Sequence, residues 1–203
     1  MSKSSSSVNA HELEAFHHEV EQHLGVRGEI VAFGVSRTLR LDLRGRHVEV
    51  GTNGSYLWVT ADLRWDAFPE SALLTCAPEG SYNRAKALED GTIPAKTGDP
   101  SFDQTYLLLG GAADAIAAAL TPQARRVLLE FADLRPELQG TDFGADPPKA
   151  ARRVHLRCEP DLRLTGHGSS FVRLGAERFT PEHAVGVAER LTACAERLEA
   201  ALS

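Results

Sequence analysis

Residues 97–106 read Thr97-Gly-Asp-Pro-Ser-Phe-Asp-Gln-Thr-Tyr106, and the chain continues through Leu107-Leu-Leu-Gly-Gly111 to Leu120-Thr-Pro-Gln-Ala-Arg-Arg-Val-Leu-Leu129. Asp99-Pro100 predicts a turn, because proline fixes φ and an aspartate can bond the backbone two residues on. The apolar run that follows predicts a buried strand over 102–109. A short helix is expected over 112–119. Thr121-Pro122 then starts another helix, with proline where its missing N–H costs nothing.

The residues before this stretch predict one helix and a meander of strands. Asn9 and Glu12 form a capping box, and an apolar stripe at helical spacing predicts a helix over 10–24. Alternating apolar and polar residues predict half-buried antiparallel strands. Asn53-Gly54 is typical of a two-residue hairpin turn. The expected strands are 30–35, 39–43, 48–50, 56–63 and 73–76.

The rest of the chain predicts two long loops, short strands and a terminal helix. Residues 78–100 are expected to be irregular, with a helical turn near 84–88, because proline and glycine recur there. Residues 140–148 resemble a linker. Strands are predicted over 154–158, 162–164 and 171–174, and Thr180-Pro181 starts a long C-terminal helix.

This order predicts an α+β fold: a mainly antiparallel sheet with N-terminal, central and C-terminal helices packed on one face. We expect a disordered lead over 1–8 and a single domain over 9–203. Two half-repeats, 9–135 and 150–203, are a further possibility, because a Thr-Pro helix follows strands in each.

Composition narrows the class of protein. The chain has 203 residues and a net charge of −6, which gives solubility and argues against general nucleic-acid binding. Its three cysteines lie far apart in apolar patterns, which indicates buried thiols in a reducing cytoplasm. We find no signal peptide and no apolar run long enough to span a membrane.

The Thr97-Gly-Asp-Pro-x-Phe-Asp stretch and the later Leu120-Thr-Pro-x-x-Arg-x-x-Leu-Leu129 resemble a module of uncharacterised bacterial proteins. The similarity covers roughly 28–202, and its specific part is 97–129. In that family the module is often fused to membrane segments, which this chain lacks. The resemblance implies a stand-alone bacterial version, and it carries no assigned activity.

Few residues qualify as candidates for chemistry. Asp99 and Asp103 fit a structural role in the turn, and a loop site with His167 is the alternative. Glu14-x-x-His17 has the spacing of a di-iron half-site but lacks a second copy, so the histidines of residues 11–23 are expected on a solvated helix face. We therefore assign no catalytic, metal or cofactor residue.

One electrostatic feature stands out in this acidic chain. Arg153, His155 and Arg157 share one face of a predicted strand, and Arg163 follows on the next. Such a face could bind an anion or an acidic partner. The alternative interpretation is a solvated sheet face paired with the chain's carboxylates.

Three functions remain as hypotheses. The first is a non-catalytic module that binds another protein or a second copy of itself; its element order is similar to that of small acidic secretion chaperones, an analogy of order alone. The second is an enzyme with an unfamiliar site near 78–103, using Asp90, Asp99, Asp103 or His167. The third is an anion or nucleic-acid binder that uses the arginine-rich strands. The first is preferred, because no catalytic constellation is recognisable.

Overall fold

An antiparallel sheet forms the centre of the computed structural model, which describes residues 10–53, 57–65, 68, 73–77, 79–80, 82–110, 113–141, 153–158, 162–164, 171–173 and 180–203. Its strands are β1 (Gly28–Phe33), β2 (Ser36–Leu43), β3 (Arg46–Thr52), β4 (Leu57–Leu63), β5 (Leu73–Cys76), β6 (Tyr106–Leu109), β7 (Glu137–Thr141) and β8 (Arg153–Cys158). They lie in the order β1-β2-β3-β4-β8-β7-β5-β6. Two further strands, β9 (Leu162–Leu164) and β10 (Phe171–Arg173), form a separate antiparallel pair.

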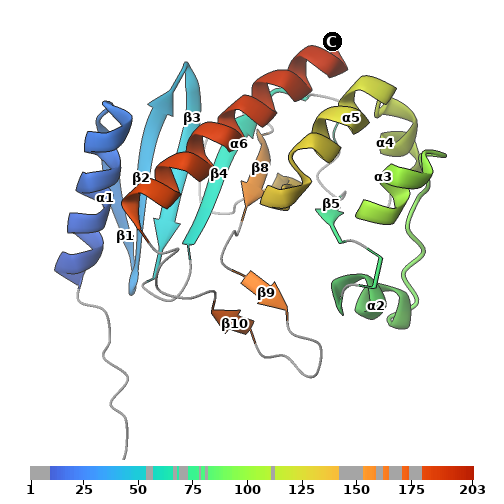
Figure 1. Cartoon of the computed structure of the whole chain (residues 1–203), viewed down its shortest axis with the longest axis horizontal. Coiled ribbons are helices and arrows are strands. Elements are labelled where there is room, and N and C mark those ends of the chain that lie inside the picture. Colours follow the sequence, from blue (N-terminus) through green and yellow to red (C-terminus); the bar gives the residue numbers. More distant parts are fainter. Residues whose placement is uncertain are drawn as a thin grey trace, which may run out of the picture.

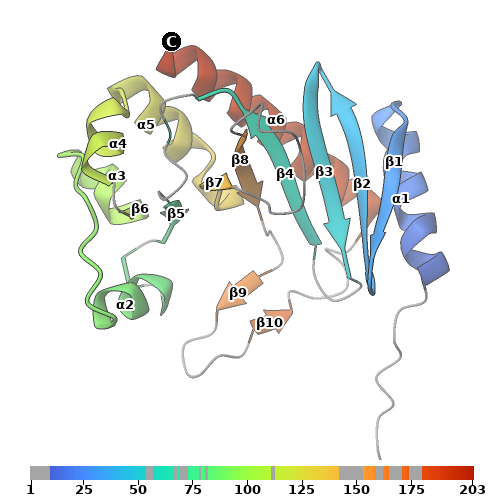
Figure 2. The same cartoon turned by 180° about the vertical axis from the view of Figure 1, so that it is seen from behind.

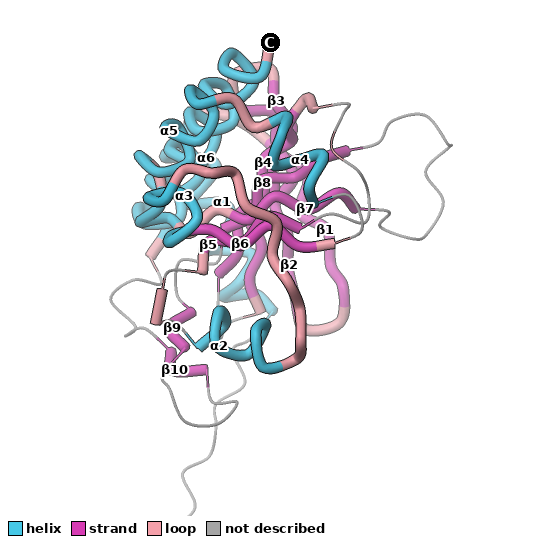
Figure 3. The backbone as a smooth tube through the Cα atoms, turned by 90° about the vertical axis from the view of Figure 1, so that its right-hand side faces the viewer, coloured by secondary structure: helices cyan, strands magenta, loops and turns pink. Residues whose placement is uncertain are grey.

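Helices at the start, centre and end of the described chain complete an α+β fold, as the sequence predicts. They are α1 (Ala10–Leu24), α2 (Tyr82–Glu89), α3 (Pro100–Thr105), α4 (Ala113–Ala119), α5 (Pro122–Glu130) and α6 (Pro181–Leu202), with a 3-10 turn, η1, at Ala132–Leu134. Figures 1 and 2 show α6 crossing the sheet diagonally, with α1 at the β1 end. Figure 3 shows α1, α5 and α6 on the same side of the strands.

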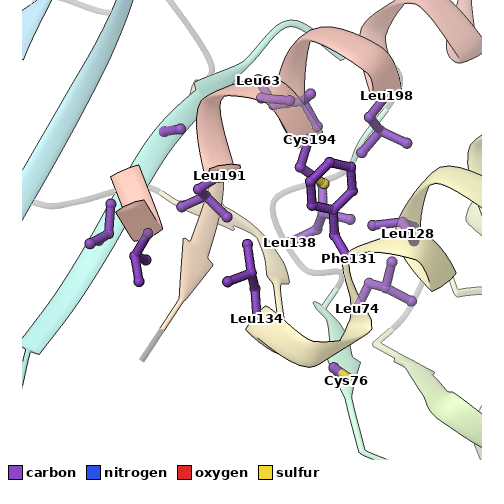
Figure 4. Close-up of a cluster of buried hydrophobic side chains, with 14 of the residues drawn as sticks. Leu63, Leu74, Cys76, Leu128, Phe131, Leu134, Leu138, Leu191, Cys194 and Leu198 are labelled. Atoms are coloured by element: carbon purple, nitrogen blue, oxygen red, sulfur yellow. The ribbon is translucent and has the colours of Figure 1, made fainter. Parts of the chain in front are cut away.

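The core lies between this helical layer and the inward face of the sheet. Leu39, Leu41 and Leu43 of β2 are buried, while the residues between them point to the outer face. Helix α1 packs against β2, and α6 packs against β3, β4 and β8. Figure 4 shows part of this core, where Leu191, Cys194 and Leu198 approach the residues of α5 and η1. Strand alternation and helical periodicity therefore bury the faces that the sequence predicts.

One ion pair anchors the C-terminal part of α6 to the sheet. Arg46 at the start of β3 donates to both carboxylate oxygens of Glu199, at 2.7 and 2.8 Å. The backbone N–H of Arg64 donates to the same carboxylate, at 2.6 Å. Burial alone would raise the pKa of Glu199, but the bonds from Arg46 and Arg64 lower it below its ordinary value. The C-terminal part of α6 is thus tied to β3 and to the end of β4.

Residues 97–106, which we call the turn stretch, form a helix where a strand was predicted. The prediction of a strand over 102–109 is wrong for its first half, because residues 100–105 form α3 and only 106–109 form β6. Asp99 caps α3: its carboxylate accepts from the N–H groups of Ser101 and Phe102, at 3.1 and 3.2 Å. Pro100 at the first helical position supports the same start.

Three other expectations need correction. The predicted loop 78–100 contains a full helix, α2, rather than a single turn near 84–88. Residues 137–141, at the edge of the predicted linker 140–148, form β7. Thr52 pairs with Leu57, whereas a two-residue Asn53-Gly54 turn would pair Thr52 with residue 55. Gly54 itself lies outside the described residues. The predicted lead 1–8 and the cap at Asn9 lie outside the described residues.

The Thr121-Pro122 cap makes a prediction for stability. The Thr121 hydroxyl accepts from the N–H of Ala124 at 3.0 Å and donates to the carbonyl of Ala201 at 2.8 Å. We expect Thr121→Ala to lower the free energy of unfolding by about 1–2 kcal/mol. Thr105→Ala is the control, because the exposed Thr105 hydroxyl only donates back to Ser101 within α3. Equal urea midpoints for the two variants would contradict a stabilising role of the Thr121 hydroxyl as a helix cap.

Candidate functional site

The two aspartates of the turn stretch are engaged by the backbone around them. Asp103 accepts from the N–H and the hydroxyl of Thr97, at 3.0 and 2.9 Å, and from the N–H of Gly98 at 3.3 Å. Asp99 caps α3 and lies 3.5 Å from Arg125 of α5. These contacts fix the path of the chain from residue 97 into α3 and onto α5, so they fit the structural interpretation of both residues.

The loop site predicted from the sequence combines Asp99 and Asp103 with His167. Because His167 lies outside the described residues, nothing places it beside the two aspartates. Among the described residues, no three histidine, cysteine or acidic side chains gather in a way that could hold a metal ion. The described part of the chain also contains no helix long and apolar enough to cross a bilayer.

The described cysteines are poorly suited to nucleophilic chemistry. Cys76 and Cys194 are buried and free. Burial raises the pKa of Cys76 to about 11 and that of Cys194 to about 12. Both groups are therefore thiols at neutral pH, and the thiolate is the reactive form. Their burial agrees with the sequence interpretation, while Cys158 has no described side chain.

The arginine-rich strand lies in the middle of the sheet. In β8, His155 is opposite Asp62 of β4, and Arg157 is opposite both Thr60 of β4 and Glu137 of β7. Acidic residues therefore occupy the neighbouring register positions on this face. Arg163 is on β9, in the separate two-stranded sheet, and is not part of this row. Of the four residues predicted as an anion-binding face, the register brings Arg153, His155 and Arg157 to one face.

The strands on both sides of β8 carry further charged residues on the same outer face. Arg40 of β2 donates to Glu49 of β3 at 2.8 Å, and Glu49 is opposite Thr60 in the register. Beyond Arg157, Glu137 accepts from Thr75 of β5 at 2.5 Å. The outer face carries alternating charges rather than a continuous basic patch, which weakens the case for an anion site.

A different part of the molecule presents exposed apolar side chains. Phe33 and Val35, at the tip of the β1–β2 hairpin, are 86% and 77% exposed. Phe33 is opposite Ser36, so the turn consists of Gly34 and Val35 alone. Gly34 has φ +56°, as the first position of a type II′ turn requires. Because exposed apolar side chains that lie together can mark an interaction site, we take Phe33 and Val35 as the candidate surface.

Arg37 holds this hairpin tip in place. Its side chain, largely buried, donates to the carbonyls of Gly34 and Ser36 at 3.1 and 3.0 Å. Its Nε lies 3.4 Å from the carboxylate of Glu14 on α1. The hairpin and α1 are thus joined by one guanidinium group, so Phe33 and Val35 are presented in a fixed arrangement. Such preorganisation lowers the entropy lost when a partner binds.

The hairpin also ends the sheet. β1 pairs with β2 alone among the described strands, so its other edge faces away from the sheet. In a two-residue hairpin the pair beside the turn is hydrogen-bonded, here Phe33 with Ser36, and every second residue follows it. Ile30 and Ala32 therefore direct their N–H and C=O groups to the free edge. The N–H of Gly28, in the same alternation, donates to Glu21 of α1 at 2.7 Å instead of to β2.

We name the free side of β1 with Phe33 and Val35 the β1 edge. The sequence predicts a strand over 30–35 but assigns no site to it, because apolar residues in a strand pattern indicate burial by default. One local signal points to Val35, because it follows Gly34 in a tight turn and turn residues lie at the surface, whereas Phe33 carries no such signal.

Helix α1 beside this edge contains a buried histidine. The histidines of this helix are predicted on a solvated face, and this prediction is wrong for His17. The residue is fully buried, and its Nε2 lies 3.0 Å from the carbonyl of Val50 in β3. Its place on the stripe with Leu13, Phe16 and Val20 explains the burial. His18 and His23 are exposed.

His17 predicts a pH dependence of stability. Burial lowers its pKa below the ordinary value of 6.5, although the carbonyls of Leu13 and Val50 oppose this shift. Below that value the unfolded chain binds a proton that the folded chain does not, so stability is complete above the unfolded pKa and falls as pH decreases. We expect a larger loss of unfolding free energy between about pH 7.5 and about pH 5.5 in the native chain than in His17→Gln. Equal losses in urea titrations would contradict this role.

Comparison with known proteins gives no relative: no family model, curated protein or solved structure matches this chain. The resemblance of residues 97–129 to a bacterial module therefore stays a prediction.

Proposed function

We propose that this chain is a non-catalytic protein-binding module of the bacterial cytoplasm, and that its partner docks at the β1 edge. The observation that carries the proposal is the exposure of Phe33 and Val35 on a hairpin held by Arg37. Apolar and aromatic side chains at the centre of a contact supply most of its binding energy. The two buried, free cysteines suit a reducing compartment.

The other two hypotheses receive less support from the described residues. The enzyme hypothesis names Asp90, Asp99, Asp103 or His167 near 78–103, and of these the Asp99 and Asp103 carboxylates cap and brace the backbone. An anion site on β8 would face the acidic residues Asp62 and Glu137 in the neighbouring strands. At the β1 edge, by contrast, the exposed side chains of Phe33 and Val35 are not part of the hydrophobic core.

The test is capture of a partner from cells that make this chain. Phe33→Ser/Val35→Ser removes the apolar tip, and both side chains are exposed, so the unfolding free energy should change by less than about 1 kcal/mol. Leu88→Ser/Ile93→Ser is the matched control, because these are the other exposed large apolar residues among those described. After cross-linking, we expect the native chain and the control to retain the same partner.

The tip variant should retain at least about tenfold less of it. Equal recovery by the tip variant would show that the partner docks elsewhere. Failure of the native chain to enrich any protein would count against a binding module altogether.

A further inference from the structure

We infer that the partner at the β1 edge is a second copy of this chain, whose own β1 pairs with it antiparallel about a two-fold axis at Val31. This assignment rests on the proposed function and names its partner. Three features of the edge support it: the number of free backbone groups, the apolar side chains beside them, and the engagement of the α1 carboxylates on this side.

The free backbone of the edge is short and matches a second β1. Ile30 and Ala32 direct their N–H and C=O groups away from β2. The N–H of Gly28 is bonded to Glu21 at 2.7 Å, so Ile30 and Ala32 carry the N–H groups of β1 that remain for a neighbouring strand. With Val31 at the two-fold axis, Ile30 of each copy pairs with Ala32 of the other through about four main-chain bonds. Each copy therefore satisfies the free groups of the other.

Such a pair joins two sheets into one, with both helical layers on the same side. Figure 1 shows the sheet of one copy ending at β1 beside α1. Ala32 lies on the face that α1 covers, because its neighbour in the alternation, Ile30, is opposite the buried Leu39. Ala32 is nevertheless exposed, so α1 leaves this part of the edge open to another strand.

The outer face of the pair covers the exposed apolar side chains. Val31 and Phe33 lie on this face, opposite Thr38 and Ser36 of β2. At the two-fold axis the two Val31 residues form a pair without main-chain bonds, in which side chains approach most closely. Phe33 of each copy reaches Val31 of the other diagonally. The side chain that is 86% exposed in one chain is thus covered by its symmetry mate.

The charges of α1 on this side do not oppose a second copy. Glu14 pairs with Arg37, with Nε and the carboxylate 3.4 Å apart. Glu21 lies 2.8 Å from the ring of His18 and also accepts from the N–H of Gly28. Both carboxylates are therefore engaged within the chain. Neither is left to attract a basic strand or to repel an identical one.

The charged residue of β1 itself also fits this arrangement. Glu29 is opposite Arg40 of β2, so it has a basic neighbour within its own chain. In the register centred on Val31, Glu29 lies opposite Phe33 of the second copy. Its own symmetry mate is about 13 Å further along the strands, at about 3.3 Å per residue. At that separation the repulsion between two exposed carboxylates is largely screened.

The first measurement is sedimentation velocity of the full chain between about 1 and about 200 µM. A contact of this kind is at the small end of specific interfaces, about 1,000 Å² in total. We therefore expect a reversible dimer with a micromolar dissociation constant. Hydrogen exchange at the amides of Ile30 and Ala32 should slow as the concentration rises, because each amide then donates to the other copy.

A charge-swap pair tests the two-fold axis at Val31. Val31→Lys and Val31→Glu each place two like charges opposite each other in the dimer, and each should weaken it at least about tenfold. An equimolar mixture of the two variants places opposite charges there and should recover the dimer at least about tenfold over either variant alone. Poor folding of a variant cannot produce such recovery. Thr38→Lys is the matched control, because Thr38 is opposite Val31 but one strand further from the axis.

Three results would overturn the inference: a monomer at every concentration, a dimer that Val31→Lys weakens no more than Thr38→Lys, or no recovery on mixing. In the capture experiment, the retained partner should be the untagged chain itself. If a different protein is retained and still requires Phe33 and Val35, the proposed function stands and the partner is not a second copy. If neither uses the edge, both fail.

Discussion

Replacing Arg84 with methionine is expected to lower the free energy of unfolding by about 3–4 kcal/mol. Arg84 is buried, and its guanidinium donates to four backbone carbonyls, those of Ala77, Asp103, Gln104 and Tyr106, at 2.7 to 3.1 Å. Methionine has a similar length and no donor. The variant would therefore leave these carbonyls without the group that satisfies them.

The location of these carbonyls explains why one side chain has so large an expected effect. Ala77 directly follows β5, and residues 103–106 lead into β6, so Arg84 joins the two ends of the long connection between neighbouring strands. In α2 it is the one buried residue among those with described side chains. Among the described side chains of the helix, from Arg84 to Glu89, it is therefore the hydrogen bonds of Arg84 and not an apolar face that hold it to the sheet.

Urea denaturation checks the size of the effect, and hydrogen exchange checks its location. Lys86→Met is the control, because Lys86 is exposed on the same helix and its loss should cost less than about 0.5 kcal/mol. We expect faster exchange in Arg84→Met over residues 77–106 first. Similar stability of the two variants would show that α2 is held in some other way.

Arg84 also illustrates what the sequence could not predict. A helix is recognised by an apolar stripe, and α2 exposes Leu88 while it buries an arginine. The pattern of residues 82–89 therefore resembles a loop with one helical turn. The helices α1 and α6 were predicted well, because their apolar residues recur at helical spacing and pack against the sheet.

The turn stretch was predicted correctly in its chemistry and wrongly in its extent. Asp99 and Pro100 start a structure, as turn residues do, but they start a helix rather than a strand. Phe102 is buried in either case and stacks on Tyr106, with ring centroids 4.8 Å apart. Apolar residues in a short run cannot distinguish a buried helical turn from a strand.

The candidate site was predicted least well. Phe33 and Val35 belong to a predicted strand, but Val35 lies in the turn after it, and the exposure of Phe33 depends on which strand ends the sheet. That order follows from the insertion of β8 between β4 and β7, which is a long-range pairing with no local signal. Arg153, His155 and Arg157 attracted attention because charge is visible in a sequence, whereas the acidic residues that neighbour them lie on other strands.

The strand that the sequence missed gives the second large prediction. Leu138, in β7, is fully buried, and it pairs with Leu74 of β5 and Leu156 of β8. Figure 4 shows it in the same cluster as Phe131 and Cys194. Leu138→Ala would remove most of a buried side chain between two layers, and we expect a loss of about 2–5 kcal/mol in unfolding free energy.

This substitution tests whether residue 138, which lies just before the predicted linker 140–148 and has no predicted element, belongs to a buried strand. In an exposed linker a leucine can be truncated for less than about 0.5 kcal/mol, and Leu88→Ala, at an exposed position of α2, provides that reference. Leu138→Val keeps most of the side chain and should recover at least half of the loss, because the cost follows the volume removed. Equal urea midpoints for Leu138→Ala and Leu88→Ala would show that β7 is not part of the core. The pairing that joins β8 to β5 would then need a different explanation.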